Sequence, residues 1–496
     1  MPAEFPPTSD GRLLSNLMHI IWLSRQDLQA QYDLNEEAGR EGFLRWFAFA
    51  AAQEYLLPNA VPKVGKPSPR PGPLYYSLVR TGSRLARLTH WMPHSVRRRG
   101  WSLWLELAMK LGAQPALRET TSGPGKAPAL PGVNLVGYAN GLLSLGEHIR
   151  MSAKALAQTS HDFAVVDFQV GVTSRQQSRD EQIPTVRSNR FSTNLFHVNA
   201  DQMLNAYTHL GHPFFADRYN IGFWAWELSE FPENWVPMIS FVDEIWAPSR
   251  FVQEAIAQVT DKPVTLMPEC VELPEFESLG RGHFGLPDDA YLFIYLFDFL
   301  SFMERKNPQA AVAAFHKAFP AGDEPAGLVL KVMNGNEDDP QWQSLVARIA
   351  GDKRIVLINE TMSRSRSLAL LNCCDCFLSL HRSEGFGRGP AEAMALGKPV
   401  IATNYSGNTD FTKATNSLLV DYTLVPVAPG AYLYGHGKVW AEPDVEHAAQ
   451  HMRFVSSDPC GAAHIAEAGR AYVREHLSAR AVGRTMTERL GDLGLL

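Results

Sequence analysis

The stretch that decides the fold is Leu378-Ser-Leu-His-Arg-Ser-Glu384-Gly-Phe-Gly-Arg-Gly-Pro-Ala-Glu392-Ala-Met-Ala-Leu-Gly397-Lys-Pro399. It opens with an apolar run that predicts a strand covered on both faces, as the strands of parallel sheets are. A glycine-rich loop follows, and Pro390 suits the first position of a helix that ends near Gly397. Such a loop leaves backbone N–H groups free at a helix N-terminus, where an anion such as phosphate binds.

Two carboxylates, Glu384 and Glu392, bracket this loop with seven residues between them. Carboxylates accept hydrogen bonds from hydroxyl groups, so the stretch suits a ligand that carries both phosphate and hydroxyls, such as a nucleotide sugar. The alternative is structural. In that case Glu392 favours the helix dipole from the first turn, and Glu384 is a solvated loop charge.

The composition is that of a globular protein with more than one domain. The chain has 496 residues, 45% of them hydrophobic and 20% charged, and its formal net charge of −6 gives no nucleic-acid signature. No apolar run is long enough to span a membrane, and the N-terminus lacks the pattern of a signal peptide. The five cysteines do not indicate a disulfide framework, so we expect a cytoplasmic protein.

Residues 1–130 are predicted to form a helical, basic extension. Helices are expected over residues 15–31 and 35–55, and a proline-rich linker follows them. The segment Arg80–Arg99 then combines many arginines with Trp91 and contains no acidic residue. This pattern suits peripheral contact with an anionic membrane at the inner face of the plasma membrane. A face that docks on the rest of the protein through arginine stems is the alternative.

From residue 131 short apolar runs alternate with helical stretches, which predicts parallel sheets covered by helices on both faces. We expect two successive domains of this kind, residues 131–265 on the acceptor side and residues 266–460 on the donor side. Further helices are expected over residues 461–496. Ligands of such sheets bind beyond the C-terminal ends of the strands, so one ligand would lie in a cleft between the facing domains.

A second glycine-rich loop lies in the first of these domains. The stretch Gly137-Tyr-Ala-Asn-Gly141-Leu-Leu-Ser-Leu-Gly146-Glu-His148 follows an expected strand and leads into a helix. Gly141 and Gly146 would again offer backbone N–H groups to a phosphate. The glycine spacing is not that of a dinucleotide-binding fingerprint, and a tight strand-to-helix turn is the alternative.

Two adjacent cations, Arg305 and Lys306, follow another expected strand and precede Pro308, which suits the start of a helix. A diphosphate needs cations, and these residues are well placed to supply one. Because they are neighbours in the chain, we do not expect both side chains to point into the site. A solvated pair at a helix start is the alternative.

Aromatic and acidic residues gather after the strand expected over residues 221–224. Aromatic rings stack on sugars and carboxylates bind hydroxyls, so we assign Trp226, Glu227 and Asn199 to the acceptor. Core packing of the tryptophans is the alternative. The cluster Cys373-Cys374-Asp375-Cys376 lacks a further ligand at zinc spacing, so we expect it to be buried and predict no metal site.

With these residues in view, the chain resembles the retaining GT-B glycosyltransferases of family 4 over most of residues 133–475. The resemblance rests on the E-x7-E motif, on Ala395-Leu-Gly-Lys-Pro-Val-Ile-Ala-Thr403 after it, and on Gly285-Leu-Pro-Asp-Asp289 before the second domain. It implies an α/β protein with the GT-B fold, two Rossmann-like domains that face a cleft, here with an α-helical N-terminal extension. It also implies a nucleotide diphosphate sugar as donor, without a metal or other cofactor.

The resemblance implies a role for each matching residue. Glu384 would contact the hydroxyls of the transferred sugar, and Glu392 would hold the ribose. Lys306, with Arg305 beside it, would neutralise the diphosphate, and the loop that holds Gly141 and Gly146 would close over the donor from the other domain. The glycine-rich loop would line the sugar and the diphosphate through Gly385, Phe386, Gly387, Arg388 and Gly389.

The chain departs from the family pattern at three places. Ser301, which we also assign to the donor site, stands where the family usually has an arginine. Arg305 or Arg388 would compensate for the missing arginine. Asn307 replaces the glycine that usually follows the lysine. Asp410 stands in the place of a glutamate.

The reaction implied by the resemblance is the transfer of a hexose, with retention, to a glycan or a lipid-linked glycan. The leaving phosphate would accept the proton of the acceptor, so no nucleophile is needed. Bacterial surface polysaccharide synthesis is the expected setting. The alternatives are a non-catalytic protein of GT-B shape that binds carbohydrate or nucleotide, and a GT-B phosphorylase, for which no cofactor-bearing lysine is identified in the sequence.

Overall fold

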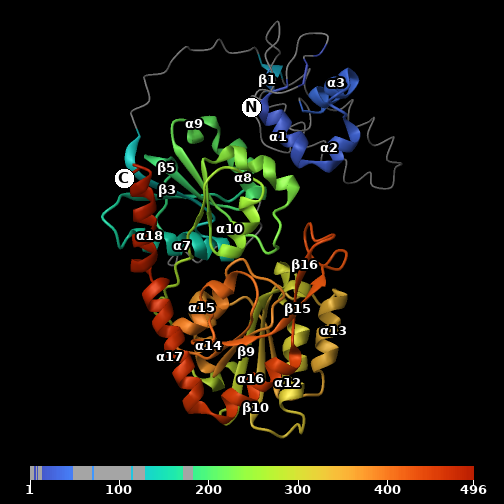
Figure 1. Cartoon of the computed structure of the whole chain (residues 1–496), viewed down its shortest axis with the longest axis vertical. Coiled ribbons are helices and arrows are strands. Elements are labelled where there is room, and N and C mark those ends of the chain that lie inside the picture. The colour runs from blue at the N-terminus through green and yellow to red at the C-terminus, as the bar shows by residue number, and fades with distance from the viewer. Residues whose placement is uncertain are drawn as a thin grey trace. The chain divides into compact units, whose positions relative to one another are not determined.

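The computed structural model describes residues 5–6, 8, 14–47, 70–71, 113–114, 129–170 and 183–496 (Figure 1). The chain divides into two compact units, residues 1–129 with 201–216, and residues 130–200 with 217–496. The segment Arg80–Arg99 lies outside the described residues, so its contact with a membrane stays a prediction. None of the helices in the described ranges is long and apolar enough to cross a membrane.

Short helices make up most of the described part of the first unit. These are α1 (Asn16–Ser24), α2 (Gln26–Gln31), α3 (Glu37–Trp46), nearly all of α8 (Ala200–Leu210), and α9 (His212–Phe215). Two strands of two residues each, β1 (Arg70–Pro71) and β2 (Ala113–Gln114), pair antiparallel in the same unit. The predicted helical character of the N-terminal extension is confirmed by α1 to α3.

The single helix expected over residues 15–31 is wrong, because the chain forms two helices there. Arg25 separates them in an extended conformation, with φ −126° and ψ 99°. Ser15 caps the first helix by accepting a hydrogen bond from the N–H of Met18 at 3.2 Å. Ile21 of α1 and Leu28 of α2, on either side of this break, are both buried.

Two parallel six-stranded sheets form the centre of the second unit. The first has the order β4-β3-β5-β6-β7-β8 and the second the order β11-β10-β9-β12-β13-β14. Every neighbouring pair in both sheets is parallel, which confirms the predicted pair of Rossmann-like domains. The strands of the first sheet are β3 (Leu130–Gly137), β4 (Phe163–Asp167), β5 (Phe191–His197), β6 (Tyr219–Phe223), β7 (Glu244–Ala247) and β8 (Val264–Leu266). Those of the second are β9 (Tyr291–Asp298), β10 (Ala326–Met333), β11 (Ile355–Asn359), β12 (Cys376–Ser379), β13 (Val400–Thr403) and β14 (Leu418–Val420).

Strand β9 shows how the second sheet is held between two layers. Phe293 and Tyr295 pack into one apolar cluster, and Leu292 and Ile294 pack into another. Alternate side chains of a strand point to opposite faces, so both faces of this sheet are covered and buried. The first sheet has a comparable apolar cluster of its own that includes Val133.

Helices cover these sheets, as Figure 1 shows, and the last one returns to the first domain. Helix α17 contacts α15 of the second domain, whereas α18 packs along α7 of the first. Gly483 permits that contact, because an added Cβ would lie 2.3 Å from the carbonyl oxygen of Ala155. The helices of this unit are α7 (Ser144–Leu156), α10 (Arg250–Ala257), α11 (Met303–Lys306), α12 (Pro308–Ala318), α13 (Pro340–Ile349), α14 (Arg364–Cys373), α15 (Arg388–Ala395), α16 (Val445–Ser457), α17 (Pro459–His476) and α18 (Ala479–Asp492), with 3-10 turns η3 (Glu233–Phe241), η4 (Arg281–Phe284), η5 (Phe299–Ser301) and η6 (Gly407–Asp410).

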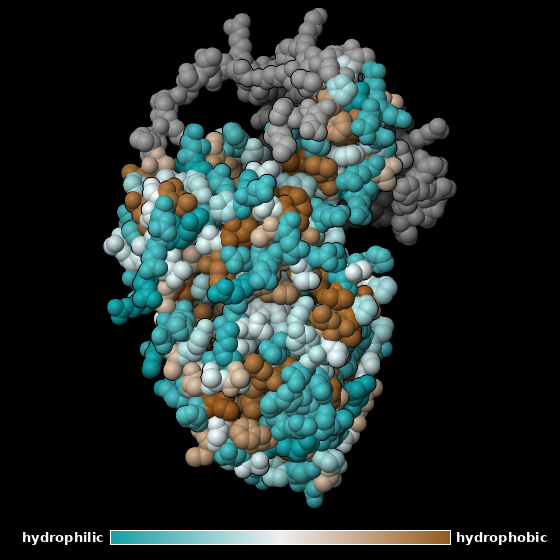
Figure 2. Space-filling view, in the orientation of Figure 1, coloured by the Kyte–Doolittle hydropathy of each residue, from teal (hydrophilic) through white to brown (hydrophobic). Residues whose placement is uncertain are grey.

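A hairpin that the sequence did not predict follows the last strand of the second sheet. Strands β15 (Tyr422–Pro426) and β16 (Val439–Pro443) pair antiparallel outside that sheet. Leu424 is 55% exposed and Leu433 in the connecting loop 49%, and Figure 2 shows hydrophobic surface over this hairpin. The prolines and glycines of residues 426–437 concealed the hairpin in the sequence, because they are typical of linkers as well as of turns.

Candidate active site

The two cations predicted to meet a diphosphate are held just beyond β9, at its C-terminal end. The turn η5 and the four-residue helix α11 follow the strand, and the backbone turns sharply at both ends of α11. Phe302 before it and Asn307 after it have positive φ values of 63° and 53°. Asparagine tolerates this left-handed conformation better than most residues, which explains why Asn307 can replace the glycine of the family pattern.

Both cations contact Glu384, which follows β12, the neighbour of β9 in the sheet. The guanidinium Nη1 of Arg305 lies 3.2 Å from Oε2 of Glu384, and the Nζ of Lys306 forms an ion pair with Oε1. The expectation that only one of the two cations points into the site is therefore wrong. Both side chains are long enough to converge on one carboxylate from consecutive positions of a single helical turn.

Burial and charge act in opposite directions on this group. Burial raises the pKa of the Glu384 carboxyl, but the charges of Lys306 and Arg305 outweigh it and bring the pKa to about 2. Burial lowers the pKa of Lys306, and the charge of Arg305 adds to that effect against the attraction of Glu384. The carboxylate is therefore the better stabilised member of the pair, and it stays ionised over the physiological range.

Glu227, assigned to the acceptor, lies next to the same cations. Its Oε1 is 3.7 Å from Nη2 of Arg305, and its Oε2 accepts a hydrogen bond from the hydroxyl of Tyr432 at 2.6 Å. The guanidinium of Arg305 also lies 5.7 Å from the centre of the Tyr432 ring. Because Glu227 follows β6 and Tyr432 follows β15, this contact joins the first domain to the second.

The other two residues assigned to the acceptor have structural contacts. The indole of Trp226 is only 1% exposed and packs against Trp235 at a ring distance of 4.9 Å, which favours the core-packing alternative for this residue. Its Nε1–H donates to the carbonyl of Glu230 at 2.8 Å. The Oδ1 of Asn199 accepts a hydrogen bond from the backbone N–H of Ala225 at 3.0 Å and so holds the loop before Glu227.

The loop 385–389 is a tight element pressed against the first domain. The hydroxyl of Ser249 donates to the carbonyl of Gly385 at 2.6 Å, and a Cβ on Gly385 would lie 3.1 Å from the carbonyl oxygen of Trp226. Gly387 caps α15 with a φ of 96°, which only glycine adopts readily. Phe386 is buried and its ring packs at a tilt against that of Phe411, with the ring centres 5.0 Å apart, so its side chain is part of the core rather than of an open surface.

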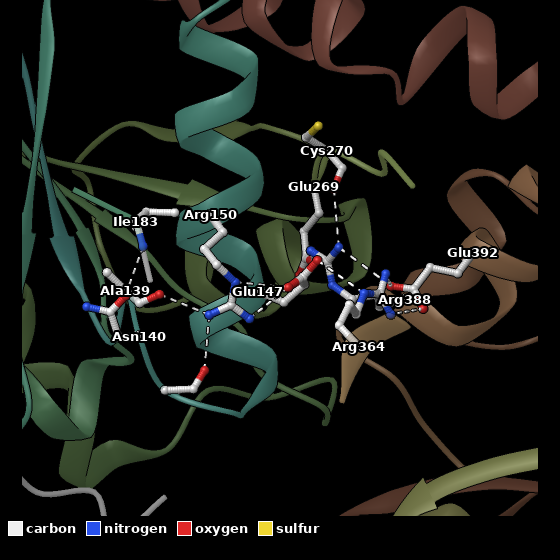
Figure 3. A network of polar contacts seen from close by, with 11 residues as sticks. Ala139, Asn140, Glu147, Arg150, Ile183, Glu269, Cys270, Arg364, Arg388 and Glu392 are labelled. Atoms are coloured by element: carbon white, nitrogen blue, oxygen red, sulfur yellow. Dashed lines mark hydrogen bonds and ion pairs between the residues drawn. The ribbon is translucent and has the colours of Figure 1, made fainter. Parts of the chain in front are cut away.

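Glu392 lies on α15 and is held by Arg364, the first residue of α14. The two side chains form a fork, with Nη1 2.9 Å from Oε2 and Nη2 2.7 Å from Oε1. Nη1 of Arg388 lies 4.0 Å from Oε1 of Glu392, and Arg388 pairs with Glu269 from the segment after β8 (Figure 3). The structure thus brings the predicted Glu392 and Arg388 into one charged cluster.

The glycine loop of the first domain is built around Gly146. A Cβ on Gly146 would lie 2.2 Å from the carbonyl oxygen of Gly141 and 2.8 Å from that of Tyr138, so no larger residue fits. Arg150, one turn further along α7, donates to the carbonyls of Ala139 and Gly141 at 2.9 and 3.1 Å. These contacts tie the loop to the helix that follows it.

Two further predicted residues lie at the edges of this region. Ser301 is half-buried at the end of η5, just before the bend at Phe302. Asp410 accepts a hydrogen bond from the backbone N–H of Arg250 through Oδ2 at 2.7 Å. It therefore interacts with the N-terminus of α10 in the other domain, a position that its carboxylate charge suits.

Two buried histidines that the sequence did not single out as a pair meet between β5 and α7. The rings of His148 and His197 are perpendicular at 4.5 Å. Burial lowers the pKa of both imidazoles well below the usual value, and the charge of Arg388 adds to this for His148. Both rings are therefore neutral at physiological pH.

The cysteine cluster occupies the end of α14 and the start of β12. Cys374 and Cys376 are each 1% exposed, and burial raises the pKa of both thiols above the usual value. Within the part of the chain that the structure describes, no group of three or more histidine, cysteine or acidic side chains could hold a metal ion.

A cavity of about 750 Å³ lies beside α7, and Glu384 is not among its lining residues. Met151 of α7 and Val165 of β4 line it, and Glu147 and Arg364 form part of its wall. The charged cluster around Glu392 therefore borders this cavity through Glu147 and Arg364.

Part of the chain that carries these residues matches the model of a known protein family. Residues 298–472 match the family model Glycosyl transferases group 1, and this span contains Arg305, Lys306, Arg364, Glu384 and Glu392. A search of curated protein sequences found no match.

Solved structures resemble the chain over most of its length. The Anabaena protein HepE in complex with UDP and glucose aligns with a TM-score of 0.55 and 13% identity, covering 73% of this chain and 100% of that one. The fold is GT-B. Sucrose-phosphate synthase from Thermosynechococcus elongatus has a TM-score of 0.53 and 16% identity, over 73% of this chain and 99% of its own. A glycosyltransferase from Rickettsia africae has a TM-score of 0.52 and 14% identity, over 73% and 98%. The family match and the fold together support a glycosyltransferase.

Proposed function

We propose that the protein is a retaining, metal-independent glycosyltransferase of family 4 type. It moves a hexose from a nucleotide diphosphate sugar to a glycan or a lipid-linked glycan, in the cytoplasm and in the synthesis of a bacterial surface polysaccharide. The observation that carries the proposal is the convergence of Arg305, Lys306 and Glu384 at the C-terminal ends of neighbouring strands. Parallel α/β sheets bind their ligands at that edge, and this one faces the other domain.

In the proposed transfer reaction, each charged side chain of the site has a specific role. The bond between the sugar carbon and the diphosphate oxygen breaks, and a bond from that carbon to the acceptor hydroxyl forms on the same face. The proton of the acceptor passes to the departing phosphate. Lys306 and Arg305 stabilise the negative charge that develops on the diphosphate, and Glu384 holds hydroxyls of the transferred sugar.

The ion pairs with Glu384 are compatible with this role. Lysine carries three N–H donors and arginine five, so both cations keep donors for phosphate oxygens while they contact Glu384. Pairing also offsets the desolvation of the two cations before the donor arrives. In the same proposal Glu392 binds the ribose. The residues beside the sugar and the diphosphate are Gly385, Phe386, Gly387, Arg388 and Gly389. Ser301, Gly141 and Gly146 lie at the margins of the donor.

The acceptor is proposed to approach from the side of Glu227. This residue contacts Arg305 and the hydroxyl of Tyr432, so it lies beside the proposed diphosphate site and has a polar partner that orients it. Asn199 supports the loop that carries Glu227. Trp226 contributes through packing of that loop, and membrane contact of Arg80–Arg99 would hold the protein on a membrane that carries a lipid-linked acceptor.

The proposal is tested with the purified full chain and a set of UDP-, GDP- and ADP-sugars. UDP-glucose comes first, because the structural neighbour HepE is solved with that compound. We expect slow hydrolysis of one nucleotide sugar that persists in excess chelator, and an anomeric configuration in the released sugar that matches the donor. Hydrolysis that stops on removal of divalent metal would overturn metal independence, and an inverted product would overturn retention.

The same experiment separates the alternatives. Binding of a nucleotide sugar without any hydrolysis or transfer would indicate a non-catalytic binding protein. Release of a sugar 1-phosphate from a glycan in phosphate buffer would indicate a phosphorylase. Replacement of the arginines in Arg80–Arg99 by glutamine should reduce the membrane-bound fraction of the protein in cells. An unchanged fraction would exclude the membrane role of that segment.

A further inference from the structure

Six charged side chains form a continuous chain of alternating sign where the two domains of the GT-B unit meet (Figure 3). In order along this chain they are Arg150, Glu147, Arg364, Glu392, Arg388 and Glu269. We name it the charge chain. Each of its side chains is at most 24% exposed, so its ion pairs are screened less by solvent and salt than surface pairs.

The charge chain begins with Arg150 and Glu147 in the first domain and continues to Arg364 in the second. Nη2 of Arg150 lies 2.7 Å from Oε2 of Glu147, one turn apart on α7. The other oxygen of Glu147 lies 3.4 Å from Nε of Arg364 on α14. Arg364 therefore contacts a carboxylate of the first domain with one edge of its guanidinium.

The second half lies in the second domain and in the segment that connects the two. Arg364 uses its two terminal nitrogens for the fork with Glu392, at 2.7 and 2.9 Å. Arg388 continues the chain from Glu392 to Glu269, and its Nη1–H also donates to the carbonyl of Cys270 at 3.3 Å. One guanidinium, that of Arg364, is thus shared between Glu147 and Glu392.

The first member of the charge chain, Arg150, contacts the glycine loop of the first domain. Arg150 holds the carbonyls of Ala139 and Gly141 while it pairs with Glu147. Contacts of 2.7 to 3.4 Å therefore connect Glu392 through Arg364, Glu147 and Arg150 to the loop at Gly141.

The fork also fixes the orientation of the Glu392 carboxylate. A carboxylate has about four lone-pair positions on its two oxygens, and the fork takes one on each oxygen. Each oxygen has a further lone pair that could accept a hydroxyl donor, which suits the two neighbouring hydroxyls of a ribose 2′,3′-diol. Arginine is suited to this task because its planar fork matches a carboxylate, which lysine cannot do.

We propose that Arg364 is a positioning residue that orients Glu392 for the ribose of the donor and couples donor binding to the closure of the first domain through Glu147. The proposal rests on the proposed function, since it takes a nucleotide sugar as the ligand of Glu392. Arg364 itself touches neither the transferred sugar nor the reacting atoms. Its loss should therefore weaken donor binding far more than it slows the chemical step.

The test compares Arg364→Gln with Arg366→Gln in the full chain. Arg366 lies on the same helix two residues later and pairs at the surface with Glu360, so its variant is a matched control for loss of a guanidinium. We expect Arg364→Gln to raise the KM for the donor about tenfold, a coupling typical of linked sites, with kcat changed much less. Arg366→Gln should leave both values near those of the wild type.

A second measurement separates positioning from simple loss of structure. The affinities for UDP, GDP and ADP are compared with those for the matching 2′-deoxy compounds by calorimetry. The wild type should prefer the ribose form, and Arg364→Gln should lose most of that preference. Arg364→Lys should fold and restore part of the affinity through charge, without restoring the preference. A preference that is intact in Arg364→Gln would overturn the proposal.

The link to the first domain is tested by combining Arg364→Gln with Glu147→Gln. We expect the effects of the two substitutions on donor KM to be non-additive, because both interrupt the same contact. Additive effects would overturn the coupling. Wild-type protein that binds none of the three nucleoside diphosphates would refute the proposed function and this inference with it. A wild type that binds one of them and an Arg364→Gln variant that behaves like Arg366→Gln would refute the inference alone.

Discussion

Nη1 of Arg305 lies 3.2 Å from Oε2 of Glu384, although 79 positions separate the two residues in the chain. The contact joins the segment after β9 to the segment after β12, and Lys306 completes it from the other carboxylate oxygen. Two cations and one carboxylate therefore form the centre of the proposed donor site.

Glu384→Gln should abolish transfer while the protein stays folded. Glutamine keeps the shape of the side chain but removes the charge that orients Lys306 and Arg305. We expect kcat at saturating donor to fall by about 100-fold or more, the size of effect seen when one group that stabilises a transition state is removed. Glu467→Gln is the control, because Glu467 is exposed on α17 and pairs only weakly with Arg470. Wild-type rates in Glu384→Gln would contradict the assignment.

The low pKa of Glu384 should make its contribution to stability depend on pH. Since the folded-state pKa is about 2 and the usual value is 4.5, the contribution is complete above about pH 4.5 and is lost as pH falls toward 2. We compare the free energy of unfolding of the wild type with that of Glu384→Gln. The difference between the two should be about 3 kcal/mol larger near pH 6 than near pH 2. Urea unfolding at a series of pH values down to the lowest at which the protein folds measures the trend. A difference that does not narrow on acidification would exclude the ion pairs as the cause of the shift.

Gly146→Ala should disturb the glycine loop of the first domain. The added Cβ would meet the carbonyl oxygen of Gly141 at 2.2 Å, so the loop must move. We expect a loss of about 1–3 kcal/mol in the free energy of unfolding, with weaker binding of the nucleotide sugar. Gly491→Ala on α18 is the control, because no atom lies within 4 Å of its Cβ, and it should gain up to about 1 kcal/mol. Equal stability of the two variants would argue against the tight turn.

Tyr432→Phe should affect the acceptor more than the donor. The substitution removes the hydroxyl that donates to Glu227 at 2.6 Å but keeps the ring beside Arg305. A hydrogen bond to a charged group contributes about 1.5–3 kcal/mol, so we expect the KM for the acceptor to rise about tenfold or more. Tyr434→Phe, at an exposed ring of the same loop, should change neither KM. A rise confined to the donor KM would place Glu227 on the donor side.

Asn307→Ala should destabilise the protein, whereas Asn307→Gly should be tolerated. Asn307 has a φ of 53°, where alanine is strained by about 1–2 kcal/mol and glycine is not. Thermal unfolding of both variants measures the difference. Both variants also lose the hydrogen bond that Asn307 donates to Glu442 at 3.3 Å, so even the glycine variant should be somewhat less stable than the wild type. An alanine variant as stable as the glycine variant would exclude backbone strain at this position.

The strands were the most predictable part of the fold. Buried parallel strands consist of continuous apolar residues, and runs such as residues 291–297 and 376–380 therefore mark β9 and β12 within two residues of their observed ends. The hairpin of β15 and β16 was missed because it has no such continuous apolar run. It lies outside both sheets, where an exposed edge carries no such pattern.

Residues of the proposed site could be singled out in the sequence wherever one segment carries the pattern. Glu384, Glu392, Arg305 and Lys306 each stand in a recognisable local pattern after a strand. Arg364, Glu147 and Glu269 do not, because their importance comes from partners in other elements: Arg364 meets Glu392 across 28 positions and Arg388 meets Glu269 across 119. An isolated arginine at the start of a helix has no signature that distinguishes it from a solvated charge.

The sequence by itself determined that two α/β domains follow a helical extension, and that a glycine-rich loop between two glutamates lies at the end of a buried strand. Local propensity and hydrophobic periodicity suffice for this, because they act over a few residues. Tertiary structure alone decided that both Arg305 and Lys306 point at Glu384, that Trp226 is buried, and that Arg364 bridges the two domains. Those outcomes depend on which side chains the folded chain brings within about 4 Å, where charges interact strongly.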